Sequence, residues 1–249
     1  MNETTHTAVR VDQAVKKYAL PDGSCVFAAN GVSFDVCLGD WVYLIGPNGS
    51  GKSTVLRMIY GSITPDEGSA WVAPELEGTV QYVEQGILSN LVPSMTVLEN
   101  MLLVRETKTK RLPSLHLFKQ SSRMEKIRAS LALFGMGLEG RLNERVSHLS
   151  GGQQQAIVAA RVLSASPRLL LLDEFTSALD FKVSKQVLNV IQKYAKDNQV
   201  TVISVTHDLH QLEAMKGKVV VLDEGRVKTS LDLNAQAVSA REIAEVVYG

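Results

Sequence analysis

Hydrophobic residues along the chain follow two spacings, one typical of strands and the other typical of helices. Short apolar runs predict strands, and they fall at residues 41–45, 79–84, 169–172 and 200–205. A helical spacing over 182–196 gathers apolar side chains on one face, namely Val183, Val187, Val190 and Tyr194. Because strands and helices alternate, the pattern predicts an α/β fold with a parallel sheet.

Turn residues and helix ends divide the rest of the chain. The stretch 8–45, rich in Val and Phe, predicts a strand meander, and turns are expected at residues 21–23, 30–31 and 65–68. One helix is expected to end at Gly61 and another to begin near Gly151. Two elements close the chain: a hairpin over 219–231 that turns at Glu224 and Gly225, and a last helix capped by Ser239 and Glu242.

The middle of the chain, residues 86–148, predicts helices. Two of its helix starts match the capping box, in which a hydroxyl residue and a glutamate three positions later satisfy each other's backbone N–H groups: Thr96 with Glu99, and Ser122 with Glu125. Since sheet strands precede and follow this segment, it is expected to be a helical subdomain inserted into the α/β core. Within it, the basic stretch 105–123 is expected to be a loop or a short irregular helix, either a solvated linker or a docking surface for another protein.

A glycine-rich stretch at 46–54, GPNGSGKST, directly follows the apolar run at 41–45. Its glycines let successive backbone N–H groups converge on a phosphate, and the helix that begins near Gly51 points its positive end at the anion. Lys52 adds a positive charge, and Ser53 offers a hydroxyl to Mg²⁺. The stretch therefore predicts a nucleoside triphosphate site formed by Gly46, Pro47, Asn48, Gly49, Ser50, Gly51, Lys52, Ser53 and Thr54.

Composition restricts the partners of this site. The chain has 249 residues with 26 Lys plus Arg and 26 Asp plus Glu, so no overall charge draws it to nucleic acid or to an anionic membrane surface. Cys25 and Cys37 form no metal-binding pattern and indicate reduced thiols of a cytosolic protein. The start of the chain lacks the pattern of a signal peptide, and no apolar run reaches 18 residues, so the chain is not expected to cross a membrane by itself.

Polar side chains end the other predicted strands. Asp173 and Glu174 follow the run of four leucines at 169–172, where Asp173 is placed to hold Mg²⁺ and Glu174 to activate or orient the attacking water. His207 ends the run at 200–206 and is placed to reach the γ-phosphate, while Gln85 ends a shorter run and is placed to reach that water or Mg²⁺. The carboxyl ends of parallel strands share one edge of a sheet, so these side chains are expected to meet.

The segment LSGGQQQ at 149–155 predicts a second anion-binding helix start. Ser150 suits the N-cap position, and Gly151 and Gly152 leave the backbone N–H groups bare. An ordinary structural cap is the alternative interpretation of these residues.

In their order and approximate spacing, these motifs resemble those of the nucleotide-binding subunits of ATP-binding cassette (ABC) transporters, over essentially the whole chain. The resemblance implies a P-loop NTPase fold, with a mostly parallel central sheet, an N-terminal antiparallel β subdomain and an inserted helical subdomain. It implies one domain over residues 1–249, with a core at 8–85 and 149–249 and the helical part at 86–148.

The resemblance also assigns roles to residues. It implies catalytic roles for Glu174, His207 and Gln85, and metal contacts for Ser53, Gln85 and Asp173. It implies a signature segment made of Leu149, Ser150, Gly151, Gly152 and Gln153, a D-loop made of Ser177, Ala178, Leu179 and Asp180, and stacking of adenine on Tyr18. Two features depart from the family pattern: Phe175 stands where proline is usual, and the region between Gly68 and Thr79 is short.

As the resemblance implies, ATP and Mg²⁺ are the cofactors, and the signature helix of one subunit caps the γ-phosphate held by another. The expected partners are a second copy or another ABC ATPase subunit, integral membrane permease subunits and a solute-binding protein, with no nucleic acid. The expected location is the inner face of the cell membrane. The similarity of residues 136–178 to cassettes of bacterial binding-protein-dependent importers indicates that subgroup.

Other functions are compatible with the same motifs. The main alternative is an ABC-type ATPase that drives a membrane partner in signalling or in regulation of the cell envelope, without transport. A soluble cassette of DNA repair or translation is disfavoured because the chain has neither a second cassette nor a long coiled coil. An ATP-binding scaffold without hydrolysis is disfavoured by Glu174 and His207.

Overall fold

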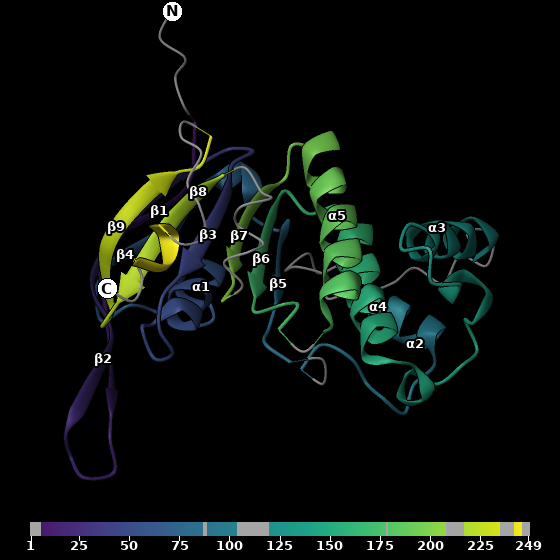
Figure 1. Ribbon diagram of the computed structural model, residues 1–249, viewed down its shortest axis with the longest axis horizontal. Coiled ribbons are helices and arrows are strands. Elements are labelled where there is room, and N and C mark those ends of the chain that lie inside the picture. Colours follow the sequence, from purple (N-terminus) through teal and green to yellow (C-terminus); the bar gives the residue numbers. More distant parts are fainter. Residues whose placement is uncertain are drawn as a thin grey trace, which may run out of the picture.

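The computed structural model of the chain describes residues 6–86, 89–103, 120–177, 179–207, 217–234 and 242–245. These residues form two sheets (Figure 1). The smaller sheet is antiparallel and has the strand order β2 (Cys25–Cys37), β1 (Thr7–Ala19), β4 (Glu67–Val72). The larger sheet has the order β5 (Val80–Val83), β6 (Leu169–Asp173), β7 (Thr201–Val205), β3 (Trp41–Ile45), β8 (Lys218–Asp223), β9 (Arg226–Asp232).

All neighbours in the larger sheet are parallel except β8 and β9, which form an antiparallel hairpin. The predicted α/β fold, with a mostly parallel sheet and a separate N-terminal antiparallel sheet, is confirmed. Because β3, β5, β6 and β7 run in the same direction, the segments that follow them leave from one edge of the sheet.

Among the described residues, the named helices are α1 (Lys52–Tyr60), α2 (Val97–Leu102), α3 (Gln120–Ala132), α4 (Gly151–Ser164) and α5 (Phe181–Asp197). Short 3₁₀ turns described between them are η1 (Pro74–Leu76), η3 (Leu138–Gly140) and η4 (Val146–His148). Helix α1 contacts strands of both sheets, whereas α4 and α5 lie on the opposite face of the larger sheet, with α2 and α3 beyond α4 (Figure 1). None of the helices described is both long and apolar enough to span a bilayer.

The four leucines of β6 explain why this strand is apolar without interruption. Leu169 and Leu171 pack into the core that contains α1 and the smaller sheet. Leu170 and Leu172 pack into the second core, under α4 and α5. Alternate residues of a strand point to opposite faces, so a strand covered on both faces needs apolar residues throughout.

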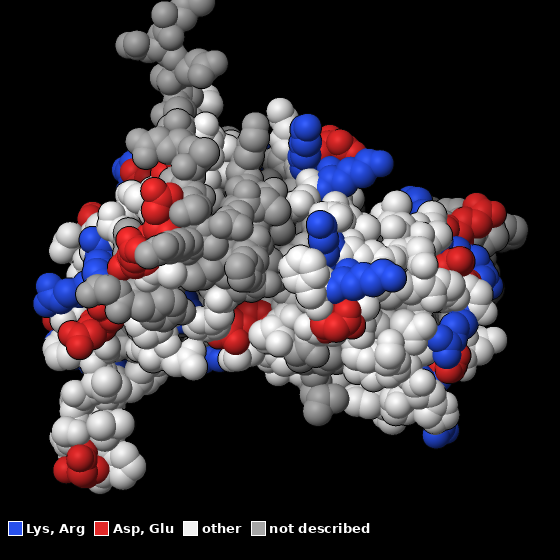
Figure 2. All heavy atoms as spheres, in the orientation of Figure 1, with Lys and Arg blue, Asp and Glu red and all other residues white. Residues whose placement is uncertain are grey.

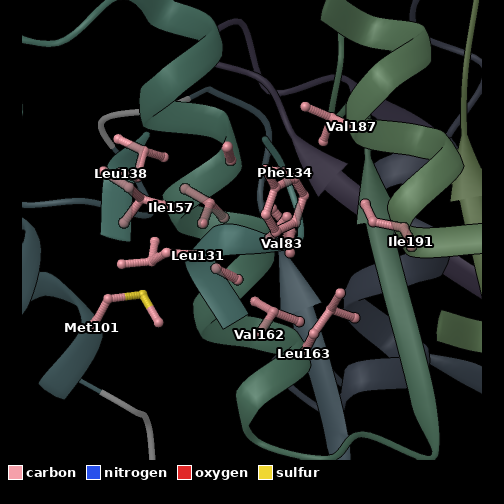
Figure 3. Packing of buried hydrophobic residues seen from close by; sticks show 14 of the residues in the cluster. Val83, Met101, Leu131, Phe134, Leu138, Ile157, Val162, Leu163, Val187 and Ile191 are labelled. Atoms are coloured by element: carbon pink, nitrogen blue, oxygen red, sulfur yellow. The ribbon is translucent and has the colours of Figure 1, made fainter. Parts of the chain in front are cut away.

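The second core joins the helical segment to the sheet. It is one cluster that includes Val83 of β5, Leu131 of α3, Ile157 of α4 and Val187 of α5 (Figure 3). Thus the buried apolar side chains in the described part of the segment 86–148 pack against helices that also cover the sheet.

Substituting Leu131 with Ala is expected to lower the free energy of unfolding by about 3 kcal/mol, because the side chain is fully buried and its removal leaves a cavity. Leu133→Ala is the matched control, since 55% of that side chain is exposed two positions away. Its effect is expected to stay within about 0.5 kcal/mol. Urea unfolding monitored by circular dichroism measures both, and equal losses would contradict this packing.

Most of the predicted elements lie where the sequence indicates, and three local predictions are wrong. The turn expected at 30–31 is part of β2, where Gly31 has φ +79° at an irregularity in the pairing with β1. The turn expected over 65–68 ends earlier, because β4 begins at Glu67. The helix start expected at Ser122 lies inside α3. In the first two cases a neighbouring strand supplies hydrogen bonds that an isolated turn lacks.

Other local predictions are met. Helix α1 ends at Gly61, a left-handed C-cap, and the hairpin turns between β8 and β9. Thr96 and Glu99 form both hydrogen bonds of the capping box before α2. The stretch 105–119 and Ser239 lie outside the described residues, and of the predicted last helix only 242–245 is described, as helix.

The surface carries both signs of charge. On the face shown in Figure 2, Lys and Arg side chains alternate with Asp and Glu side chains among the described residues. This agrees with the formal net charge of zero.

Candidate active site

The loop between β3 and α1 is held in shape by glycines with positive φ angles. Gly46 has φ +146° and Gly51 has φ +96°. A Cβ atom on Gly46 would lie 1.9 Å from the backbone oxygen of Leu222, and one on Gly51 would lie 1.8 Å from that of Ala28. The loop is therefore packed against β8 on one side and β2 on the other, at distances that only glycine allows.

Helix α1 presents an open N-terminus to a cavity of about 430 Å³. Its N-cap, Gly51, is left-handed and makes no side-chain capping bond, so the first N–H groups of the helix have no capping partner in the described structure. This cavity, named the phosphate cavity, is lined by Ala28, Asn48, Gly49, Gly51, Lys52, Ser53, Thr54, Gln85 and Glu174. Bare N–H groups and the helix dipole make this position suitable for a phosphate. A larger cavity, about 870 Å³, borders residues such as Asp40 and Val200 at the opposite ends of the strands and takes no part in this site.

The Lys52 side chain is folded back onto the loop. Its Nζ donates hydrogen bonds to the carbonyl oxygens of Gly46 (2.9 Å) and Pro47 (2.8 Å), and it lies 3.4 Å from Ser50 Oγ. Burial lowers the pKa of the Lys52 ammonium, and the neighbouring Glu174 and Asp173 carboxylates oppose that shift. A phosphate at the α1 terminus would offer this ammonium a stronger acceptor than a carbonyl.

Asp173, at the end of β6, is buried, and both of its carboxylate oxygens accept hydrogen bonds. Its Oδ1 accepts a hydrogen bond from Ser53 Oγ and its Oδ2 accepts one from the Tyr82 hydroxyl, both at 3.0 Å. Burial raises the pKa of the Asp173 carboxyl, whereas the bonds from Ser53 and Tyr82 lower it. The carboxylate is thus paired with the serine of the phosphate loop.

Glu174 lies between two polar side chains from other strand ends. Its Oε2 accepts a hydrogen bond from Gln85 Nε2 at 2.8 Å, and its Oε1 also lies 2.8 Å from His207 Nε2. The residue has φ +46°, and its backbone N–H donates to the carbonyl oxygen of Val205 in the neighbouring strand. This unusual backbone conformation is the kind of local strain that accumulates at functional sites.

The N-terminus of α4 is the second predicted anion-binding helix start, and it lies outside the cavity at the N-terminus of α1. Ser150 Oγ accepts a hydrogen bond from the N–H of Gln153, and the Gln153 side chain accepts one from the N–H of Ser150. A Cβ on Gly152 would lie 2.5 Å from a methyl group of Val183, so glycine allows α4 to approach α5. None of Leu149, Ser150, Gly151, Gly152 and Gln153 lines the cavity at the phosphate loop.

Comparison with known proteins identifies the family. A model of the family described as ABC transporter matches residues 29–177. The chain belongs to the ABC transporter family. The spermidine/putrescine import ATP-binding protein PotA 1 of Pseudomonas aeruginosa is 35% identical over 231 residues, which cover 90% of this chain and 60% of that protein. The probable amino-acid ABC transporter ATP-binding protein y4tH of Sinorhizobium fredii is 34% identical, and the match covers 80% of this chain and 81% of that protein.

Solved structures agree with this family. A dimeric post-hydrolysis state of the ATP-binding cassette MJ0796, bound to ADP and Pi, has a TM-score of 0.77 and 27% sequence identity, with 90% of this chain and 98% of that chain covered. The predictions of an ABC fold, of ATP binding and of an ATPase of this family are therefore confirmed. The chain spans less than two thirds of the length of the PotA relative.

In this ABC cassette the segment predicted as a D-loop adjoins the backbone of Glu174. Ser177 Oγ donates to the backbone oxygen of Glu174 at 3.0 Å, and Asp180 caps α5 by accepting from the N–H of Val183. The N–H of Leu179 donates to the carbonyl oxygen of Thr176. A cavity of about 360 Å³ connects this segment with Glu174 and His207. Ala178 lies outside the described residues.

The position of Tyr18 differs from that of the other candidate residues. It lies near the end of the β1–β2 hairpin, paired with Val26, with 39% of its surface exposed. It does not line the phosphate cavity, to which the hairpin contributes Ala28. Adenine stacking on Tyr18 stays a prediction.

Sequence reasoning missed Tyr82, the second donor to Asp173. The only signal was its place in a β run, two positions before Glu84 and three before Gln85. Its role depends on β5 lying next to β6, which no local pattern reveals.

Proposed function

We propose that this ABC cassette binds MgATP in the cavity at the phosphate loop and hydrolyses it within a dimer. The observation that carries the proposal is the convergence of Lys52, Ser53, Asp173 and Glu174 at one sheet edge, beside an uncapped helix N-terminus. The loop N–H groups and Lys52 bind the phosphates. The carboxylate of Glu174 lies where it accepts a proton from the attacking water, and Gln85 and His207 hold it in place.

The residues present fit Mg²⁺. Ser53 Oγ and the Asp173 carboxylate are hard oxygen donors 3.0 Å apart, and the side-chain oxygen of Gln85 is the third candidate. The described residues contain no group of three or more His, Cys, Asp or Glu that could hold an ion alone. This agrees with the usual mode of Mg²⁺, which binds through one or two protein oxygens together with substrate phosphates. When bound, the ion neutralises developing charge on the phosphates.

The α4 N-terminus supports a composite site in a dimer. The capping box occupies the N–H groups of Ser150 and Gln153, so those of Gly151 and Gly152 remain for an anion, yet these residues do not line the cavity of their own chain. In the proposed dimer, Ser150, Gly151 and Gly152 of one subunit complete the phosphate site of the other. Two copies, or this chain with another ABC ATPase subunit, satisfy this arrangement.

Mixing two inactive variants tests the composite site. Lys52→Ala removes the phosphate charge, and Gly151→Glu places a carboxylate at an exposed position of the α4 N-terminus. Each alone is expected to be inactive, whereas an equimolar mixture is expected to recover about a quarter of the wild-type rate of phosphate release, because half of the dimers contain one intact site. Mixing two batches of the same variant is the control. A mixture as inactive as its components would refute completion by a second subunit.

Transport through separate membrane permease subunits is the second part of the proposal, by likeness to PotA 1 and y4tH, whose names describe import and an amino-acid ABC transporter. A groove of about 330 Å³, bordered by Glu84, Leu91, Val92 and Leu103, is a candidate contact site for such a partner. Its apolar side chains Val92 and Leu103 are 37% and 41% exposed, so a partner could cover them. The Asn90 side chain donates to the carbonyl oxygens of Glu84 and Gly86 and so connects the groove to the segment that carries Gln85.

We propose that residues 86–148 form the inserted helical part of a single ABC domain, with its core at 8–85 and 149–249, and that this part passes motion to the permease. The cassette then resides at the inner face of the cell membrane, and a solute-binding protein supplies the solute. The basic stretch 105–123 is a further candidate contact surface.

Co-purification tests the membrane partner. Tagged protein extracted from membranes is expected to retain an integral membrane subunit, identified by mass spectrometry. The double variant Val92→Asp, Leu103→Asp is expected to lose it while keeping the basal ATPase rate, because neither side chain lines the phosphate cavity. Leu133→Asp, at an exposed position outside the groove, is the matched control. A retained partner that is not a permease would favour signalling or cell-envelope regulation instead.

A further inference from the structure

We propose that Tyr82 is a positioning residue for Asp173, fixing the carboxylate that, with Ser53, holds Mg²⁺. The inference rests on the proposed function, since it assigns a new residue to the metal half of that site. Nothing in the motifs of the chain points to Tyr82, and the tertiary structure alone brings its hydroxyl to the carboxylate.

The parallel pairing of β5 with β6 brings Tyr82 near Asp173. Tyr82 pairs with Leu171, so its side chain begins two residues before the carboxylate and reaches forward along the neighbouring strand. Its hydroxyl is 3.0 Å from Asp173 Oδ2, while Ser53 Oγ is 3.0 Å from Asp173 Oδ1. The two carboxylate oxygens therefore have separate donors, one from β5 and one from α1.

The carboxylate determines the direction of these hydrogen bonds. An ionised carboxylate has no hydrogen to donate, so the hydroxyl groups of Tyr82 and Ser53 both donate to Asp173. The Tyr82 ring is also packed against that of Tyr60, with centroids 5.3 Å apart, which restricts the position of the hydroxyl.

Two fixed donors prevent the carboxylate from turning. Asp173 is 1% exposed, so bulk water is not available to replace a lost donor. With the Ser53 hydrogen directed to Asp173, the lone pairs of Ser53 Oγ remain for a cation. Outer partners of this kind orient metal ligands, and their removal commonly weakens metal binding by about 10- to 100-fold.

The test compares Tyr82→Phe with Tyr60→Phe in a Glu174→Gln background, in which ATP is not consumed. Binding of a fluorescent ATP analogue is measured in EDTA and across a Mg²⁺ titration. Tyr82→Phe is expected to bind the analogue in EDTA within about 2-fold of the parent and to need about 10-fold more Mg²⁺ for half-maximal enhancement. Tyr60→Phe removes a hydroxyl from the adjacent ring and is expected to behave as the parent.

An unchanged Mg²⁺ requirement in Tyr82→Phe would overturn the positioning role. A loss of binding in EDTA as large as the loss in Mg²⁺ would overturn it too, because that result indicates general damage. If the parent itself shows no Mg²⁺ enhancement, the proposed function fails first and this inference fails with it.

Discussion

Glu174→Gln is expected to lower the rate of ATP hydrolysis by about 10²- to 10⁴-fold while ATP still binds. The amide keeps the size of the carboxylate, accepts one hydrogen bond from Gln85 or His207, and donates to the other partner where that partner accepts. It no longer accepts a proton from water. Because the nucleotide is not consumed, the dimer that encloses it is expected to persist, and size-exclusion chromatography with light scattering in MgATP measures this.

Glu77→Gln is the control for this result, since it makes the same chemical change at an exposed position outside the phosphate cavity. It is expected to hydrolyse ATP at the wild-type rate and to leave the oligomeric state unchanged. Wild-type hydrolysis by Glu174→Gln would remove this residue from the chemistry. A monomer in MgATP would instead contradict the dimer.

Gly51→Ala is expected to abolish measurable ATP binding and to lower the free energy of unfolding by about 4 kcal/mol. The added Cβ would lie 1.8 Å from the backbone oxygen of Ala28, at a φ of +96° that side chains rarely adopt. Either the phosphate loop or strand β2 has to move, and both line the cavity. Isothermal titration calorimetry and urea unfolding measure the two effects.

Gly49→Ala separates steric collision from backbone strain. Gly49 has φ +83°, but a Cβ there meets nothing within 4 Å. Its stability loss is expected to be only about 1 kcal/mol, the cost of the left-handed conformation. Equal losses in the Gly49 and Gly51 variants would show that close packing of the loop against β2 is not what requires glycine at position 51.

The candidate site was predictable from sequence to different depths at different residues. The phosphate loop was predictable almost completely, because its glycines, Lys52 and Ser53 act within nine consecutive residues. Asp173, Glu174 and His207 required one further step, the rule that the ends of parallel strands share an edge. Tyr82 could not be found this way, since a tyrosine in a strand is ordinarily part of the packing.

Local rules failed where a neighbouring strand competed with them. Asn30 and Gly31 are typical turn residues, yet β2 continues through them because pairing with β1 accommodates Gly31 as an irregularity. Glu67 and Gly68 likewise join β4, which pairs with β1. Propensity is a weak local preference, and a row of hydrogen bonds to another strand outweighs it.

The amino-acid sequence by itself determined the strand-then-glycine loop, the capped start of α4 and the alternation of strands and helices, because each depends on backbone geometry within a few residues. Only the tertiary structure decided that β6 lies between β5 and β7, and therefore which side chains at the predicted edge pair: Gln85 and His207 with Glu174, and Tyr82 with Asp173. It also decided that the α4 N-terminus lies outside the phosphate cavity of its own chain. These contacts, like the hydrogen bond between Ser53 and Asp173, join residues that are far apart in the sequence, 120 positions in that last case. They arise because folding buries both faces of the sheet.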